Sequence, residues 1–266
     1  MIVFGLILFY EGDGKVKFYS FGDVNAPIIM LLSGTCCHWK SNFGKVIEPL
    51  ADTYHVLCVS YDGFDETETT EFPTMIEETE KIEKYIIEHF HGHIHAAYGC
   101  SLGGSFVGLL IARQKIHIDY GILGSSDLDQ ASPFSAKLQT NLVLPIIYPV
   151  LRDGKMPFKF MEKRLEKRGD YGKAFMDMLG GTRPYITKQS CKNQFYSDLI
   201  TPLPDHIEVP GTEIHIFYDL KMGEKYRARY AQHFAHPILH EQDLLHEELL
   251  ACYPDKWVEL VKSIVK

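Results

Sequence analysis

The stretch His93-Ile94-His95-Ala96-Ala97-Tyr98-Gly99-Cys100-Ser101-Leu102-Gly103-Gly104 decides how the rest of the chain is interpreted. It contains the pattern Gly-x-Ser-x-Gly with Ser101 at its centre, an apolar run before it and a helix-like run over residues 105–112 after it. A serine on a sharp turn between a strand and a helix needs glycines beside it, because larger side chains would clash. The stretch therefore predicts a strand, a tight turn that exposes the Ser101 hydroxyl, and a helix.

Length and charge narrow the class of protein. A chain of 266 residues suits one large α/β domain, or a core with a modest insertion. The net charge of -8 disfavours a nucleic-acid partner, because phosphate binding needs a concentrated basic face, and the sequence shows no basic patch near Ser101. No apolar run reaches the roughly 20 residues that a membrane span requires.

The spacing of the cysteines and the first ten residues indicate the cellular compartment that we expect for this protein. None of the 6 cysteines shows a Cys-x-x-Cys spacing, so we expect a reduced, cytoplasmic protein without a bound metal. Residues 1–10 are apolar but have no basic start and no small-residue cleavage site. We therefore predict a first strand there rather than an export signal, followed by a turn over residues 11–14 that leads into a second strand.

Strands and helices alternate along most of the chain. Apolar runs predict strands over residues 15–20, 27–32, 54–61, 93–98, 116–124, 213–218 and 237–240. Helical spacing predicts helices over 73–90 and 223–234 and from residue 254 onward. This alternation predicts an α/β protein with a mostly parallel, doubly wound sheet. It is interrupted over residues 128–204, which contain several prolines and no clear strand.

With its Gly-x-Ser-x-Gly pattern between a strand and a helix, the chain resembles the α/β-hydrolase superfamily. The resemblance implies an α/β-hydrolase core over residues 1–127 and 205–266, and a helical cap over 128–204 that covers the active site and excludes water. It also implies an oxyanion hole in which two backbone N–H groups stabilise the tetrahedral intermediate. Ser33-Gly34-Thr35 stands where the family usually has His-Gly and a donor, so Thr35 and Leu102 are the expected donors.

The serine needs a base and an acid. In the family's order the histidine follows the last strand, which favours His246, with His240 as the second choice. The usual position of the acid falls near Met222, which cannot act as one. Three carboxylates remain open: Asp127 is preferred, as it directly follows the strand over 116–124, ahead of Asp219 and then Glu224. Asp127 could instead cap the first cap helix.

Together these features predict a serine hydrolase that cleaves a small carboxylic ester or related acyl compound through an acyl-enzyme. No cofactor or metal is required, and the expected partner is a small-molecule acyl substrate. A thioesterase, a peptidase or lactonase, and a carbon-carbon bond hydrolase are the nearest alternatives among enzymes. A ligand-binding or signalling protein of the same fold, with slow or no turnover, is the alternative outside them. The oligomeric state is left open.

Overall fold

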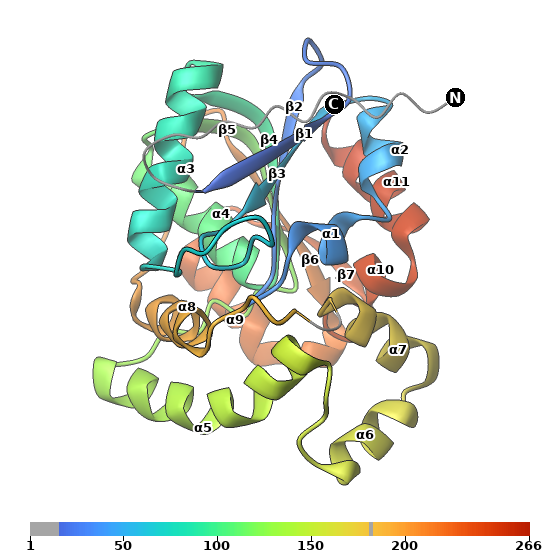
Figure 1. The fold of residues 1–266 in the computed structure, drawn as a ribbon. Coiled ribbons are helices and arrows are strands. Elements are labelled where there is room, and N and C mark those ends of the chain that lie inside the picture. Colours follow the sequence, from blue (N-terminus) through green and yellow to red (C-terminus); the bar gives the residue numbers. More distant parts are fainter. Residues whose placement is uncertain (1–15, 181–182) are drawn as a thin grey trace.

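Residues 16–180 and 183–266 are described by the computed structural model (Figure 1). The strand predicted over residues 1–10 and the turn predicted over 11–14 lie outside this part of the chain. The fold is built around a single sheet, with helices on both of its faces and four further helices at one edge.

Seven strands form this sheet. They are β1 (Lys17–Phe21), β2 (Ile28–Leu32), β3 (His55–Ser60), β4 (His93–Cys100), β5 (His117–Gly124), β6 (Glu213–Asp219) and β7 (Ile238–Gln242). Their order is β1-β3-β2-β4-β5-β6-β7. β1 runs antiparallel to β3, and all the other neighbours are parallel. The carboxyl ends of six strands therefore meet at one edge of the sheet, and the predicted mostly parallel sheet is confirmed.

The apolar strands are explained by burial on both faces of the sheet. Successive side chains of a strand point to opposite faces. In β2, Met30 and Leu32 belong to one hydrophobic cluster, while Ile29 and Leu31 belong to another. A strand between two helix layers must therefore be apolar at every position, unlike a strand with one wet face.

Helices cover the two faces. They are α1 (Trp39–Phe43), α2 (Ile47–Ala51), α3 (Met75–Phe90), α4 (Leu102–Arg113), α9 (Glu224–His233), α10 (Glu248–Cys252) and α11 (Pro254–Ile264). Helices α3, α4 and α9 contribute to the first cluster, and α1, α2, α10 and α11 to the second (Figure 1). Trp257 of α11 is fully buried and packs edge-on against Tyr98 of β4, with 4.7 Å between ring centroids.

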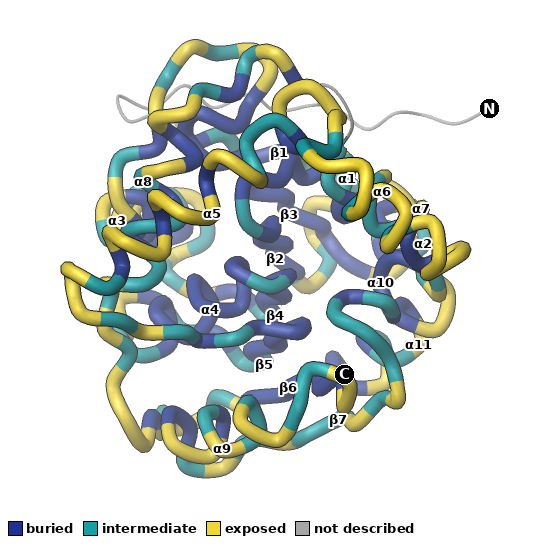
Figure 2. Tube along the Cα trace, turned by 90° about the horizontal axis from the view of Figure 1, so that it is seen from below, coloured by how far each residue is buried: buried dark blue, intermediate teal, exposed yellow. Residues whose placement is uncertain are grey.

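Four helices between β5 and β6 lie at the carboxyl edge of the sheet (Figure 1). They are α5 (Pro133–Asp153), α6 (Lys159–Glu166), α7 (Gly169–Met178) and α8 (Lys188–Ile200). α5 and α6 are largely exposed, whereas strands β2 to β6 are mostly buried (Figure 2). These helices occupy the predicted cap region, and the boundaries 128–204 for the cap, with 1–127 and 205–266 for the core, stay a prediction.

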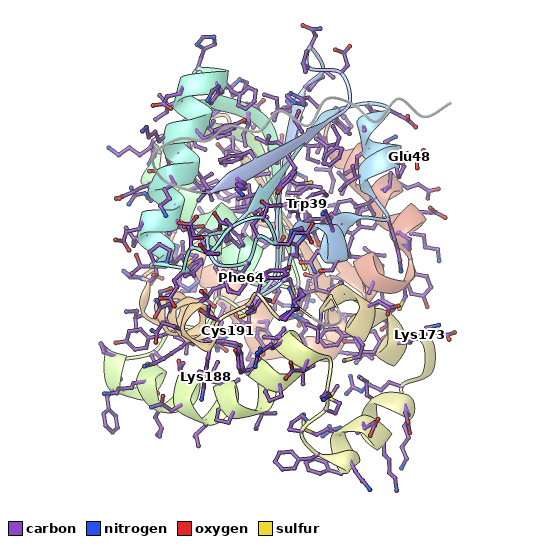
Figure 3. The ribbon with its side chains drawn as sticks, viewed as in Figure 1. Trp39, Glu48, Phe64, Lys173, Lys188 and Cys191 are labelled. Atoms are coloured by element: carbon purple, nitrogen blue, oxygen red, sulfur yellow. The ribbon has the colours of Figure 1, made fainter. Side chains whose placement is uncertain are left out.

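Several hydrogen bonds fasten this layer to the core. The Gln194 side chain of α8 accepts from the Cys36 amide at 2.5 Å, and the Met178 carbonyl of α7 accepts from Asn42 Nδ2 at 2.9 Å. Cys191 of α8 also points into the molecule, while Lys173 of α7 lies on the outside (Figure 3). The cap helices are thus packed onto the strand ends. None of the helices described over 16–180 and 183–266 has both the length and the apolarity needed to cross a bilayer.

Two details differ from the sequence-based expectation. Helices α1, α2 and α10 were not predicted, because five residues are too few for a helical period to show. Strand β6 continues one residue beyond the predicted end, since Asp219 pairs with Gln242 of β7. This extra residue places a carboxylate at the carboxyl edge of the sheet.

Candidate active site

The turn between β4 and α4 holds Ser101 in a strained backbone conformation. Its φ of 51° and ψ of -111° lie outside the regions that residues other than glycine usually adopt. Such a conformation costs of order 1–3 kcal/mol and persists only when the surroundings enforce it. Here the Ser101 amide donates to the Gly124 carbonyl of β5 at 2.7 Å, which holds the turn against the neighbouring strand.

The glycines of the motif are required by close backbone contacts. A Cβ atom on Gly99 would lie 2.0 Å from the carbonyl carbon of Gly103, and one on Gly103 would lie 2.2 Å from the Leu32 carbonyl oxygen. A Cβ on Gly104 would lie 2.6 Å from Ser126 Cβ. The turn between β4 and α4 therefore packs as tightly as the sequence pattern predicted, because each glycine lies against another chain segment.

A cavity of about 300 Å³ opens at this turn. Ser101, His246 and Thr35 all line it, so three of the predicted site residues meet in one space. The cap contributes an apolar wall that includes Ile147, Leu151, Met161, Phe175, Leu179 and Phe195. A serine hydroxyl, an imidazole and an oxyanion-loop residue thus share a largely apolar chamber, which suits acyl transfer away from bulk water.

His246 lies in the loop between β7 and α10. Burial lowers the pKa of its imidazole to about 4, so the ring is neutral at pH 7 and can accept a proton. The Tyr171 hydroxyl of α7 donates to the His246 carbonyl at 3.0 Å and ties this loop to the cap. His240 is placed differently: it lies on β7, where its Nε2 is 2.9 Å from Nδ1 of His215. Of the two histidine candidates, His246 is therefore the one that lines the cavity.

The loop after β2 leaves one amide available at the cavity. The amides of Gly34 and Cys36 donate to Asn42 Oδ1 at 2.8 Å and to Gln194 Oε1 at 2.5 Å. For the Thr35 amide, the described residues provide no hydrogen-bond acceptor. Leu102 is the first residue of α4, where a helix leaves its first N–H groups without intrahelical acceptors. Both predicted oxyanion donors thus have an N–H group that could bind a ligand.

Asp219 is the carboxylate that reaches the His246 loop. It ends β6, is 2% exposed and accepts from the backbone amide of Glu247, the residue after His246, at 3.0 Å. The Ser125 hydroxyl donates to the same carboxylate oxygen. Burial raises the pKa of Asp219 to about 6. One hydrogen bond therefore ties this carboxylate to the backbone of the residue that follows His246.

The other two acid candidates have different surroundings. Asp127 accepts from the Asp129 amide at 3.3 Å, and burial followed by the charge of Asp129 raises its pKa. Glu224 begins α9, has a side chain that is 78% exposed, and pairs with Arg227 at 3.0 Å. The hydrogen bonds and ion pairs described for these two side chains do not include the His246 loop. The signal that would have favoured Asp219 was the end of β6, which sequence periodicity placed one residue early.

Sequence reasoning missed Glu247. It is buried, lines the same cavity as Ser101, and its carboxyl group accepts from the Ser101 amide at 2.9 Å. A glutamate beside another glutamate near the chain's end gives no sequence signal of burial. Among the described residues, no group of three or more His, Cys, Asp or Glu side chains is arranged to hold a metal ion.

Comparisons with known proteins identify the fold. No protein-family model matches the sequence, and no curated protein matches it either. An alpha/beta hydrolase family protein from Desulfitobacterium hafniense is similar in structure, with a TM-score of 0.79, 17% identity and coverage of 94% of this chain and 100% of that one. A thermophilic esterase from Thermogutta terrifontis has a TM-score of 0.70, 15% identity and coverage of 97% and 96%. The enol-lactonase from Burkholderia xenovorans LB400 has a TM-score of 0.62, 18% identity and coverage of 93% and 96%. The expected α/β-hydrolase fold is thereby confirmed.

The packing of the turn predicts a contrast between two glycines of α4. We expect Gly103→Ala to lower the free energy of unfolding by about 3 kcal/mol, because the new methyl group meets backbone that cannot move away. Gly108→Ala should change it by less than about 1 kcal/mol, since its Cβ would lie 3.3 Å from the nearest atom, on the Phe234 side chain. Urea unfolding of both variants measures this difference, and equal stabilities would contradict the packing argument.

Proposed function

We propose that this chain, which has the α/β-hydrolase fold, is a serine hydrolase that cleaves a small carboxylic ester or related acyl compound through an acyl-enzyme. The observation that carries the proposal is that Ser101, on its left-handed turn, lines the same apolar cavity as His246 and Thr35. A strained serine, a neutral imidazole and a free oxyanion-loop amide in one chamber are the parts that acyl transfer needs.

In this proposal the reaction has two halves. The neutral His246 imidazole takes the proton of the Ser101 hydroxyl while the serine oxygen attacks the substrate carbonyl. The Thr35 and Leu102 amides stabilise the resulting oxyanion, and His246 gives the proton to the leaving alcohol as the acyl-enzyme forms. In the second half, water attacks the acyl-enzyme while His246 takes its proton, and His246 then returns this proton to the Ser101 oxygen as the acid leaves.

For the acid we propose Asp219 instead of Asp127. Asp219 accepts from the amide of the residue that follows His246, whereas Asp127 accepts from Asp129. A carboxylate beside the imidazole fixes its tautomer and stabilises the imidazolium that forms in each half-reaction. Because the pKa of Asp219 is about 6, this carboxylate is ionised at neutral pH.

The cavity points to an apolar, uncharged acyl group. Its cap wall is formed by aliphatic, methionine and phenylalanine side chains, so a charged substrate group would lose its hydration without a partner. The similar chains include an enol-lactonase, an enzyme described as degrading N-acyl homoserine lactone, and esterases, and a lactone is a cyclic ester. Esters and lactones of moderate acyl length are therefore the substrates that we propose.

The first test is covalent labelling with a fluorophosphonate. We expect the folded protein to be labelled at Ser101, because the base and the oxyanion donors activate this hydroxyl. Ser101→Ala should abolish labelling, whereas Ser105→Ala, one turn along α4, should keep it. Mass spectrometry of the labelled peptide identifies the site. A folded protein that stays unlabelled would contradict the hydrolase proposal and favour a ligand-binding protein.

The acid is tested by a pair of variants. Asp219→Asn should lower kcat by about 10²- to 10⁴-fold, because the amide no longer stabilises the imidazolium or selects its productive tautomer. Asp127→Asn should lower it less than about tenfold, since the side-chain hydrogen bond of Asp127 is to the Asp129 amide and Ser132, not Asp127, caps α5. Steady-state ester hydrolysis by variants with wild-type circular dichroism measures both effects. If Asp127→Asn lowers kcat more than Asp219→Asn does, Asp127 is the acid.

The substrate class is tested with p-nitrophenyl esters of graded acyl length. We expect kcat/KM to rise by about fourfold for each added CH₂ group until the cavity is full, because burying one CH₂ group contributes about 0.8 kcal/mol. Leu151→Trp, which fills part of the cap wall, should move the optimum to shorter acyl chains. An optimum at the acetyl ester in the unmodified protein would exclude an apolar acyl pocket.

A further inference from the structure

Glu247 occupies an unusual position for a glutamate. It follows His246 directly, its backbone has a φ of 54°, and it is only 2% exposed. The left-handed region disfavours side chains larger than that of glycine, and burial of a carboxyl group costs free energy unless its polar atoms are satisfied. Both costs occur at one residue of the site, so the surroundings of Glu247 must fix it in place.

The contacts of Glu247 join the two halves of the site. Its Oε1 accepts from the Ser101 amide at 2.9 Å, and its Oε2 accepts from the Tyr98 hydroxyl at 3.2 Å. Its own amide donates to Asp219 Oδ2 at 3.0 Å and to Ser125 Oγ at 2.9 Å. One residue therefore connects the turn that carries Ser101 with the Asp219 carboxylate.

Over residues 16–180 and 183–266, the groups that interact with this carboxyl carry no positive charge. They are Asp219 of β6, Tyr98 and Cys100 of β4, Cys37 before α1, Tyr171 of α7 and Tyr230 of α9, with the neutral His246 next to it in the chain. Burial first, and then the charge of Asp219, raises the pKa of Glu247 to about 8. At pH 7 the site thus holds Asp219 as an anion and Glu247 as a neutral acid.

Ionisation of Glu247 would oppose the chemistry. A second anion would lie within hydrogen-bonding distance of the Ser101 amide, beside the position at which the substrate oxygen becomes negative. In a buried site such a repulsion is weakly screened, and it would act in the transition state more than in the ground state. The neutral carboxyl makes the same hydrogen bond to Ser101 without this charge.

We propose that Glu247 is a positioning residue whose carboxyl group holds the turn of Ser101 in place, and that the site loses activity when this group gives up its proton. The proposal rests on the serine hydrolase function proposed above. The Glu247 proposal adds to that function an upper pH limit on activity. It assigns this limit to one buried side chain that is neither the base nor the acid of the reaction.

The test is a pH profile of kcat/KM and of fluorophosphonate labelling at Ser101. For the wild-type protein we expect both to fall by about tenfold for each pH unit above 8, as one ionisation requires. Glu247→Gln keeps the acceptor for the Ser101 amide but cannot ionise, so its profile, normalised to its own maximum, should stay flat over that range. Glu248→Gln is the matched control, and it should fall as the wild-type protein does.

A measurement that needs no turnover separates this proposal from the hydrolase proposal. Infrared difference spectra should show the band of a protonated carboxyl group that disappears as the pH is raised through about 8 and is missing in Glu247→Gln. If Ser101 stays unlabelled at every pH, the proposed function fails. If it is labelled but the wild-type profile stays flat above pH 8, or Glu247→Gln keeps the alkaline fall, the proposal for Glu247 is overturned. An absent infrared band overturns it as well.

Stability gives a second check. The pKa of glutamate in an unfolded chain is about 4.3, so between that pH and 8 the unfolded state loses the proton that the folded state keeps. Stability then falls as the pH rises. The Tm of Glu247→Gln relative to wild type should therefore increase from pH 5 to pH 8. If Glu247→Gln does not fold, Glu247→Gly, which suits the positive φ, should likewise lack the alkaline fall in labelling. If the Tm difference between Glu247→Gln and wild type does not change with pH, Glu247 is not protonated in the folded protein.

Discussion

The contact between the end of β4 and the start of α4 is the constraint on which the rest of the structure depends. Gly99 and Gly103 approach so closely that no side chain fits between them, and the Ser101 amide is held by the Gly124 carbonyl of β5. The strain at Ser101 is sustained because three neighbouring strands and α4 enclose the turn. Parallel strands make this possible, since their carboxyl ends bring loops from distant parts of the sequence to one edge.

Burial at that edge shifts the pKa values of three side chains. It lowers the pKa of His246 to about 4 and raises the pKa values of Asp219 and Glu247 to about 6 and about 8. Hydrogen bonds connect the two acidic residues through Ser125 and the Glu247 amide, and the imidazole of His246 belongs to the neighbouring residue in the chain. Two carboxyl groups so close together in a buried site do not both ionise readily, so the order of their ionisation becomes part of the chemistry.

The cap helices supply the apolar wall of the cavity, which the sheet does not provide. The strand ends provide polar groups, and α5, α7 and α8 close over them with apolar side chains that form most of the cavity wall. Excluding water strengthens every electrostatic interaction inside the cavity, including the ones that shift the pKa values above. Under the proposed function, the same closure limits which acyl groups can enter. The cap thus affects both the electrostatics and the selectivity that we propose.

The sequence by itself determined the elements that follow local rules. The Gly-x-Ser-x-Gly turn, the alternation of buried strands and helices, and the position of His246 after the last strand were readable because glycine geometry and apolar periodicity act over a few residues. Only the tertiary structure decided which candidate carboxylate bonds to the His246 loop, since that depends on Asp219, where β6 stops pairing with β7. It alone also placed the Glu247 carboxyl group against the Ser101 amide, because the burial of a single acidic side chain is set by segments 146 residues apart in the chain and leaves no periodic signal.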